Sequence, residues 1–207
     1  MKKQLKTIAY CRINNNTISI NGKSIITKDK DLSFSDFAKQ IYKEKQLAYP
    51  KFFKMDNLCK LAFLTSEFLF EAAKLDSEII KHTGIVLSNR ASSLDTDRKH
   101  QDTINDKDNY FPSPAVFVYT LANIMIGEIS IRHQIKGENA FFVSEKFNET
   151  LIEHYASSLI INRKSSHILC GWVDVDNNNY DAFMYLVAEK GSYNYSKEII
   201  KNIYTQN

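Results

Sequence analysis

The chain has 207 residues, 43% hydrophobic and 25% charged, which is the composition of an ordinary globular protein that can bury a core. Its net charge of +3 is too small an excess to indicate nucleic-acid binding. Its three cysteines lack paired or metal-ligand spacing, which suits a cytoplasmic protein without disulfides. No stretch reaches the roughly 18 apolar residues of a membrane-spanning helix, so no membrane span is expected.

The N-terminal part predicts strands followed by a helix. Short apolar pieces between Lys6 and Ile26 read as strands, and Asn21-Gly22 is a strong two-residue hairpin signal. The segment from Ser35 to Leu47 is weakly amphipathic and is broken at Tyr49-Pro50. We expect a β-hairpin and one short helix.

A clear helix begins after Asp56, which is placed to act as its N-cap. Its apolar positions fall on one stripe, which predicts packing on a sheet: Leu58, Leu61, Ala62, Thr65, Phe68, Leu69 and Ala72. The run from Gly84 to Ser88 then predicts a buried strand of an α/β fold.

The segment 89–109 is polar and highly charged, with neither helical nor strand periodicity. We expect a long, mobile surface loop here. A lid or partner-docking loop is the alternative, because long loops in compact domains are either mobile or used.

A long apolar segment follows this loop. Phe117 to Ile131 is apolar nearly all round a helical wheel, which predicts a buried central helix. Gly127 in its middle suggests close approach by another backbone. Arg132 and His133 are placed to end the helix, and Gly137 can supply the left-handed residue that stops it.

The next elements form a strand, a turn and a helix. Ala140 to Val143 predicts a short strand, and the polar residues after it lead into a helical pattern from Leu151 to Ile160. Acyl-transfer enzymes often present a nucleophile at such a helix N-terminus. No nucleophile lies at this turn. Strands are then expected over Ser166–Asp174 and Ala182–Ala188.

Three motifs in this region resemble the ketosynthase branch of the thiolase-like proteins. They are Gly127-Glu128-Ile129-Ser130-Ile131-Arg132-His133, then Lys136-Gly137, then Val143-Ser144-Glu145-Lys146. In ketosynthases the active cysteine lies nine residues after the glycine of a Gly-Pro pair, and counting nine from Gly137 reaches Lys146. The chain is most similar to chain-length-factor subunits of type II polyketide and aryl polyene synthases, from which it departs in having Glu138 for the proline and Lys146 for glutamine.

The resemblance covers roughly 52–190 and implies an α/β fold. The expected architecture is a thiolase-like half-domain with a mostly parallel five-stranded sheet, an antiparallel last strand, and helices around a buried central helix. The whole chain, 1–207, would be one domain similar to the N-terminal half of a ketosynthase, with a polar loop at 89–109. The half that carries the family's catalytic histidines has no counterpart.

The function that the resemblance implies is that of a non-catalytic, chain-length-factor-like subunit. It would pair as a heterodimer with an active β-ketoacyl-carrier-protein synthase in polyketide, aryl polyene or fatty-acid-like biosynthesis, and contact acyl carrier protein transiently. One alternative is a thiolase-fold acyltransferase or decarboxylase that uses Lys146. Another is a stand-alone homodimeric acyl-binding module.

No catalytic residue, cofactor or metal is expected. Cys170 and Cys59 lie in apolar patterns typical of inert core thiols, and His133 is placed as a helix cap. Asp174, Asp176 and Asp181 lack the spacing of a calcium loop and are interpreted as turn residues. The candidate pocket residues, taken from the turn, are Ser144, Glu145, Lys146 and Asn148.

The candidate interface is the strand before the turn. The resemblance implies that Ala140, Phe141, Phe142 and Val143 form a sheet edge that pairs with a partner strand across a two-fold axis. A bare apolar edge recruits other strands, so it should be covered. Adjacent residues point to opposite faces, so we expect one of Phe141 and Phe142 to face the partner and the other the core.

Overall fold

The computed structural model describes residues 4–108 and 110–206 and contains one mixed sheet. The strand order is β3-β2-β1-β7-β6-β4-β5, with β8 paired to β1. The strands are β1 (Lys6–Asn14), β2 (Thr17–Ile20), β3 (Lys23–Thr27), β4 (Gly84–Asn89), β5 (Asn139–Val143), β6 (His167–Asp176), β7 (Asn179–Ala188) and β8 (Tyr193–Asn194).

The predicted α/β class is confirmed, but the sheet is mixed and eight-stranded, whereas a mostly parallel sheet of five strands was predicted. Strands β5, β4 and β6 are parallel neighbours, and β7 runs antiparallel to both β6 and β1. The expected antiparallel last strand is therefore β7. The hairpin β2–β3 extends the sheet beyond β1, and at its turn Asn21 and Gly22 both have positive φ, at 51° and 79°.

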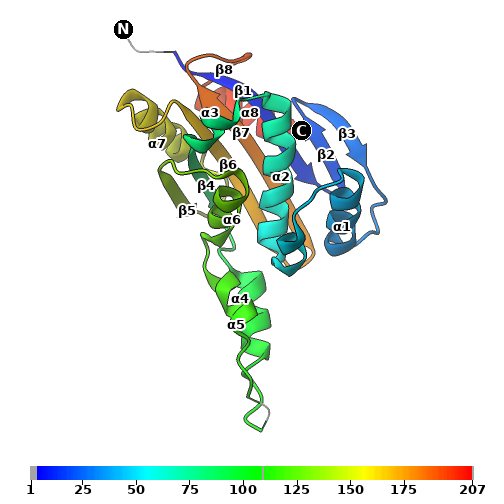
Figure 1. Cartoon of the computed structure of the whole chain (residues 1–207). Coiled ribbons are helices and arrows are strands. Elements are labelled where there is room, and N and C mark those ends of the chain that lie inside the picture. Colours follow the sequence, from blue (N-terminus) through cyan, green and yellow to red (C-terminus); the bar gives the residue numbers. More distant parts are fainter. Residues whose placement is uncertain (1–3, 109, 207) are drawn as a thin grey trace.

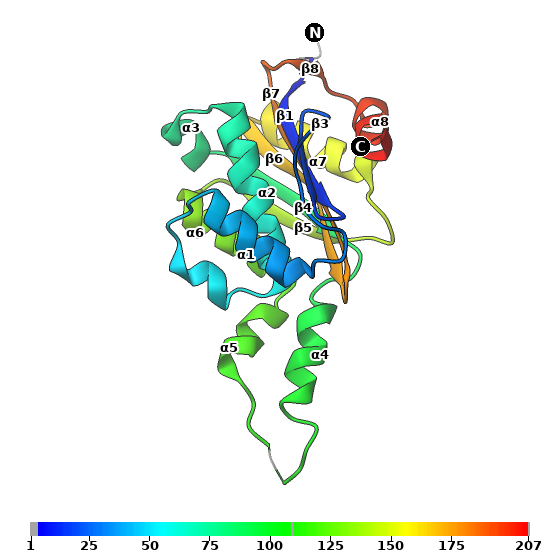
Figure 2. The ribbon, with the colours of Figure 1, turned by 90° about the vertical axis from the view of Figure 1, so that its right-hand side faces the viewer.

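Helices cover both faces of the sheet (Figures 1 and 2). One face packs mainly on α2 and α6, with α1 beside α2, and the other packs on α7 and α8. The helices are α1 (Phe34–Glu44), η1 (Pro50–Lys54), α2 (Asn57–Ala73), α3 (Ser77–Lys81), α4 (Leu94–Asp102), α5 (Pro114–Phe117), η2 (Val118–Thr120), α6 (Ile124–His133), α7 (Glu149–Ile161) and α8 (Lys197–Gln206).

The buried central helix is α2, and the prediction that it would be Phe117–Ile131 is wrong. Every residue from Leu61 to Phe70 is buried, and Asp56 caps the helix as expected by accepting from the Cys59 N–H at 2.8 Å. Polar side chains tolerate this burial because they are paired within the fold. The Thr65 hydroxyl donates to the Leu61 carbonyl at 2.7 Å, and the Glu67 carboxylate accepts a hydrogen bond from Arg132 Nε at 2.7 Å.

The segment predicted as one helix is broken into α5, η2 and α6. The first pair and α6 meet at a bend of 99°. No single helix among the described residues is long and apolar enough to cross a membrane. Gly127 does not mark a close backbone approach, because a Cβ there would meet only the Ile124 side chain at 3.9 Å. The helix is stopped by Gln134 in the left-handed conformation (φ 56°), while Gly137 lies against the Thr83 carbonyl.

The expected loop at 89–109 contains helix α4. Its first turn carries Asp95 and Asp97, its last turn carries Lys99 and His100, and an ion pair joins Lys99 to Asp95 at 2.6 Å. These charges complement the helix dipole, and this local signal outweighs the missing apolar periodicity. Residues 94–108 and 110–121, which include α4, α5 and η2, project from the sheet as an arm (Figures 1 and 2), and we use this name for them below.

Candidate functional site

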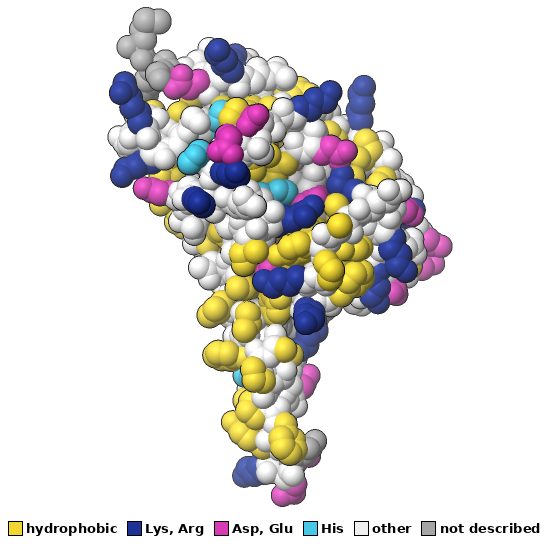
Figure 3. All heavy atoms as spheres, in the orientation of Figure 1, with side chains coloured by type: hydrophobic (Ala, Val, Ile, Leu, Met, Phe, Trp, Pro, Cys, Tyr) yellow, Lys and Arg dark blue, Asp and Glu magenta, His cyan; other side chains and the backbone are white. Residues whose placement is uncertain are grey.

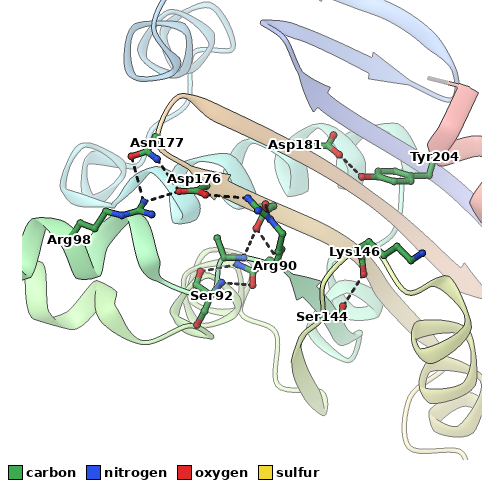
Figure 4. A network of polar contacts seen from close by, with 12 residues as sticks. Arg90, Ser92, Arg98, Ser144, Lys146, Asp176, Asn177, Asp181 and Tyr204 are labelled. Atoms are coloured by element: carbon green, nitrogen blue, oxygen red, sulfur yellow. Dashed lines mark hydrogen bonds and ion pairs between the residues drawn. The ribbon is translucent and has the colours of Figure 1, made fainter.

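Lys146 lies in the turn between β5 and α7, where counting along the sequence placed it. Asn148 caps α7 by accepting from the Leu151 N–H at 3.0 Å, and the Ser144 hydroxyl closes the turn by donating to the Lys146 carbonyl at 3.0 Å (Figure 4). The turn therefore has the shape that presents a side chain beside a helix N-terminus. Lys146 itself is exposed, so it lacks the burial that would make a lysine chemically active.

A cavity of about 440 Å³ opens beside this turn, on the α7 and α8 face of the sheet. Phe147, Trp172 and Tyr204 supply its aromatic surface, and charged side chains, including Lys146 and Lys201, line the rest. The pocket candidates Ser144, Glu145, Lys146 and Asn148 all line a smaller adjoining cavity of about 300 Å³. The structure thus brings the four together, and their role in binding an acyl group remains a prediction.

Asp174 and Asp176 lie in β6 and Asp181 lies in β7, so interpreting these three as turn residues was wrong. Their carboxylates accept hydrogen bonds or form ion pairs with other elements. Asp181 accepts from Arg12 Nε at 3.0 Å and from the Tyr204 hydroxyl at 2.7 Å, which holds α8 against β1 and β7. Asp174 accepts from the backbone N–H groups of Arg90 and Ala91 at 3.0 and 2.8 Å. Burial raises the pKa of Tyr204, and Asp181 raises it further.

Asp176 completes this network at the end of β6. Its carboxylate lies 2.7 Å from Arg98 Nη1 and 3.2 Å from Arg90 Nη2 (Figure 4), and these arginines hold its pKa below the usual range. These aspartates therefore hold separate elements of the fold together. Within residues 4–108 and 110–206, no group of three His, Cys, Asp or Glu side chains could hold a metal ion.

No activated nucleophile is found in the described part of the chain. Cys11, Cys59 and Cys170 are free and buried, and burial raises the pKa of each thiol, so all three are core residues.

Ser66 and His133 lie 3.4 Å apart, and Glu67 Oε1 lies 3.3 Å from His133. Both contacts use Nε2, whereas a catalytic triad needs the acid on the other ring nitrogen. Burial lowers the pKa of His133 to about 4, so the ring is neutral near pH 7, and its role is structural.

Strand β5 forms one edge of the sheet, and no strand among the described residues pairs with its outer side. Hydrogen bonds of 2.9 Å from Ile85 N to the Glu138 carbonyl, and from Ser144 N to the Asn89 carbonyl, bracket its pairing with β4. Parallel pairing alternates every second residue, so 138, 140, 142 and 144 direct main-chain groups toward β4. The N–H and C=O groups of 139, 141 and 143 therefore point to the open edge.

The two phenylalanines of this strand pack on opposite faces of the sheet. Phe141 packs against the core under α2 and α6, and Phe142 packs against the other core, with its ring 5.4 Å from Tyr155. The expectation that one of them faces a partner and the other faces the core is wrong, because each covers its own subunit's core. Val143, 57% exposed, is free of such packing.

The arm carries a run of exposed apolar side chains, and three of them, Phe117, Val118 and Leu121, belong to the segment that was predicted to be a buried helix. Figure 3 shows hydrophobic side chains along its length. Their exposed fractions range from 40% to 76%: Leu94, Tyr110, Phe111, Phe117, Val118 and Leu121. Pro112 and Pro114 precede the predicted helix, and Pro114 begins α5, so neither proline signals the break between η2 and α6 at 121–123.

Comparison with known proteins gives structural relatives only, since no family model and no curated protein matches the sequence. The chain resembles the ishigamide ketosynthase/chain length factor, with a TM-score of 0.68, 15% identity, and coverage of 89% of this chain and 62% of that one. It also resembles a structure of the ketosynthase ApeO in complex with its chain length factor ApeC from Xenorhabdus doucetiae (TM-score 0.58, 12% identity, 91% and 80% covered).

A third similar structure is the AntDE:AntF complex, a type II polyketide synthase acyl-carrier protein with its ketosynthase (TM-score 0.60, 12% identity, 90% and 63% covered). The chain thus spans less than two thirds of the length of two of these three proteins. Its mixed sheet between helices matches theirs over about 90% of its own residues. The chain therefore has the thiolase-like fold of the ketosynthase and chain-length-factor proteins.

Proposed function

We propose that this chain is a non-catalytic, chain-length-factor-like subunit that pairs with an active β-ketoacyl-carrier-protein synthase. The observation that carries the proposal is the turn at Lys146. The ketosynthase fold builds the strand, turn and helix that present a nucleophile, and an exposed lysine stands there. We propose that an active ketosynthase partner supplies the condensing chemistry, in polyketide, aryl polyene or fatty-acid-like biosynthesis in the cytoplasm.

Two exposed features support pairing with a large partner. The β5 edge offers unpaired main-chain groups, and the arm offers apolar side chains that a monomer would leave in water. Both features would be covered by one partner subunit that adds a strand at β5 and packs on the arm. Structures of related proteins include a ketosynthase with its chain length factor and a ketosynthase with its carrier protein, and we extend both kinds of partner to this chain.

The domain assignment follows from the same reasoning. Residues 1–207 would form one unit corresponding to the N-terminal half of a ketosynthase. Helix α8 packs on the α7 side of the sheet and helps to bury the second core, with Ile200 only 1% exposed. We expect this unit to fold alone and to dock as a preformed body.

The experiment is co-expression with full-length ketosynthases encoded in the same genome, followed by co-purification. Val143→Pro removes an outward-facing N–H, because proline has none, and leaves the pairing with β4 intact. Val143→Thr keeps both the N–H and the side-chain shape and is the matched control. We expect the Val143→Thr variant to co-purify with the ketosynthase and the Val143→Pro variant to be recovered without it.

Four results would overturn the proposal. A monomer that binds no ketosynthase, or a complex that survives Val143→Pro unchanged, would remove the proposed interface. A homodimer that binds acyl chains and ignores ketosynthases would favour the acyl-binding module. Condensation by the pure chain, abolished by Lys146→Ala, would favour an enzyme that uses Lys146.

A further inference from the structure

Glu128 in α6 is the most deeply buried charged side chain of the residues that the structure describes, at 1% exposure. A buried carboxylate is costly unless it is paired. The Tyr119 hydroxyl donates to its Oε1 at 3.3 Å, and Lys51 Nζ lies 2.9 Å from its Oε2. Lys51 and Glu128 form an ion pair by distance alone, since no donor among the described residues reaches Oε2 with hydrogen-bond geometry.

The Glu128 carboxylate connects the C-terminal limb of the arm, α5 and η2, to the body of the protein, by which we mean the sheet and the helices packed on it. Tyr119 belongs to η2, the last turn of the arm, and is itself only 7% exposed. Burial raises the pKa of Tyr119, and Glu128 raises it further, so the hydroxyl stays protonated and donates at neutral pH. Lys51 comes from η1, so three separate segments meet at one buried group.

A second buried contact connects the N-terminal limb of the arm, helix α4, to the body. Thr96 in α4 is 2% exposed and donates its hydroxyl to Asp56 Oδ2 at 2.7 Å, while Oδ1 of the same aspartate caps α2. Ser93, the residue immediately before α4, donates its hydroxyl to the Thr120 carbonyl at 2.8 Å and so joins the bases of the two limbs. Other polar contacts of the arm, from Arg98 to Asp176 and Asn177, are solvent-exposed and therefore weak.

We propose that Glu128 and Asp56 are positioning residues that hold the arm in one direction relative to the sheet. Both acceptors belong to the body, on α6 and at the N-cap of α2, and each takes one buried hydroxyl from a different limb. A rigid arm loses little freedom when its apolar side chains dock, so the anchoring raises affinity for the partner. The identity of that partner rests on the proposed function, whereas the anchoring does not.

The test measures the direction of the arm in the isolated protein. All three native cysteines are buried, so nitroxide labels attach selectively to Lys43→Cys on α1 and Lys107→Cys at the arm tip, both exposed positions. Pulsed electron resonance then gives the distribution of label distances. Tyr119→Phe with Thr96→Val removes both hydroxyl donors with little change of shape. Tyr110→Phe makes the same tyrosine change at an exposed position on the arm and is the control.

We expect a narrow distribution in the parent and in Tyr110→Phe, and one at least about twice as wide in the double variant. Amide exchange in α2 and β6 should stay slow in all of them, which shows that the body remains folded. A double variant as narrow as the parent, or a parent as broad as the variant, overturns the anchoring.

Affinity for a co-purifying ketosynthase separates the two proposals. Releasing the arm should weaken the complex by about tenfold. An unchanged affinity with a released arm overturns the positioning role. If no ketosynthase binds while the distances behave as expected, the proposed function fails and the anchoring stands.

Discussion

The body of the protein and its arm contain similar apolar residues that meet opposite fates. In the body, phenylalanines such as Phe37, Phe52 and Phe63 are fully buried, whereas Phe111 and Phe117 in the arm are 76% and 56% exposed. Hydrophobic side chains in the body stabilise the fold, because folding itself removes them from water. The exposed side chains of the arm gain less from folding, so part of their apolar surface is available to association.

The largest expected effect contrasts two identical substitutions. Phe63 in α2 stacks on Tyr49 at 5.3 Å between ring centroids and is fully buried, so Phe63→Ala should cost about 3–5 kcal/mol of unfolding free energy. Phe111→Ala in the arm should cost less than about 0.5 kcal/mol. Urea denaturation measures both. Equal losses would mean that the arm is part of the folding core.

The second effect tests the body through pH. Because the pKa of His133 falls from 6.5 to about 4 on folding, the unfolded chain binds the proton more readily, and stability is lost as pH drops from 6.5 toward 4. At pH 5 the loss from this group should be about 2 kcal/mol relative to pH 7. His133→Gln should flatten this part of the profile in urea denaturation at each pH. An unchanged slope would show that His133 is not buried as described.

The third effect concerns association. Phe117→Asp should leave the unfolding free energy within about 0.5 kcal/mol of the parent, because the side chain is mostly in water. It should weaken the complex with a ketosynthase by about tenfold or more, because a charge would be buried at the interface. Titration calorimetry on the purified pair checks this, with Lys107→Asp as a control at an exposed polar arm position. Equal weakening by both changes would point to charge alone.

The smallest effect is expected at the turn. Lys146→Ala should change stability by less than about 0.5 kcal/mol, since the side chain is exposed and makes no hydrogen bond or ion pair within the described chain. It should also leave condensation by a ketosynthase complex within about twofold of the parent. Malonyl-carrier turnover checks this. A large loss would give Lys146 a chemical role that its exposure argues against.

Local sequence determined several elements by itself. The fully buried strand β4 followed from a continuous apolar run, and the β2–β3 turn followed from Asn21-Gly22, which tolerates positive φ. The start of α2 followed from Asp56 as N-cap. The position of Lys146 between β5 and α7 followed from the apolar run at Ala140–Val143 and the helical pattern that begins at Leu151. Each of these depends on residues close together in the chain, so the sequence carries the whole signal.

Tertiary structure decided which apolar helix lies inside. The segment 117–131 is apolar nearly all round a helical wheel, yet α2 is the buried central helix. Burial of α2 requires a partner for Glu67, and Arg132 supplies it through a bidentate contact at 2.7 and 3.1 Å across 65 positions of sequence. Hydrophobic periodicity counts apolar residues and is blind to such distant pairing, which sets whether a polar group can leave water.

The same reason explains why the arm was missed. An apolar side chain has the same sequence signature whether its cover comes from its own chain or from another. The direction of the arm depends on contacts of Glu128 and Asp56 with residues from other segments. Sequence therefore determined the sheet, the turn and the absence of a nucleophile at it. Only the tertiary structure, by leaving Phe111 and Phe117 in water, decided which apolar residues are available to a partner.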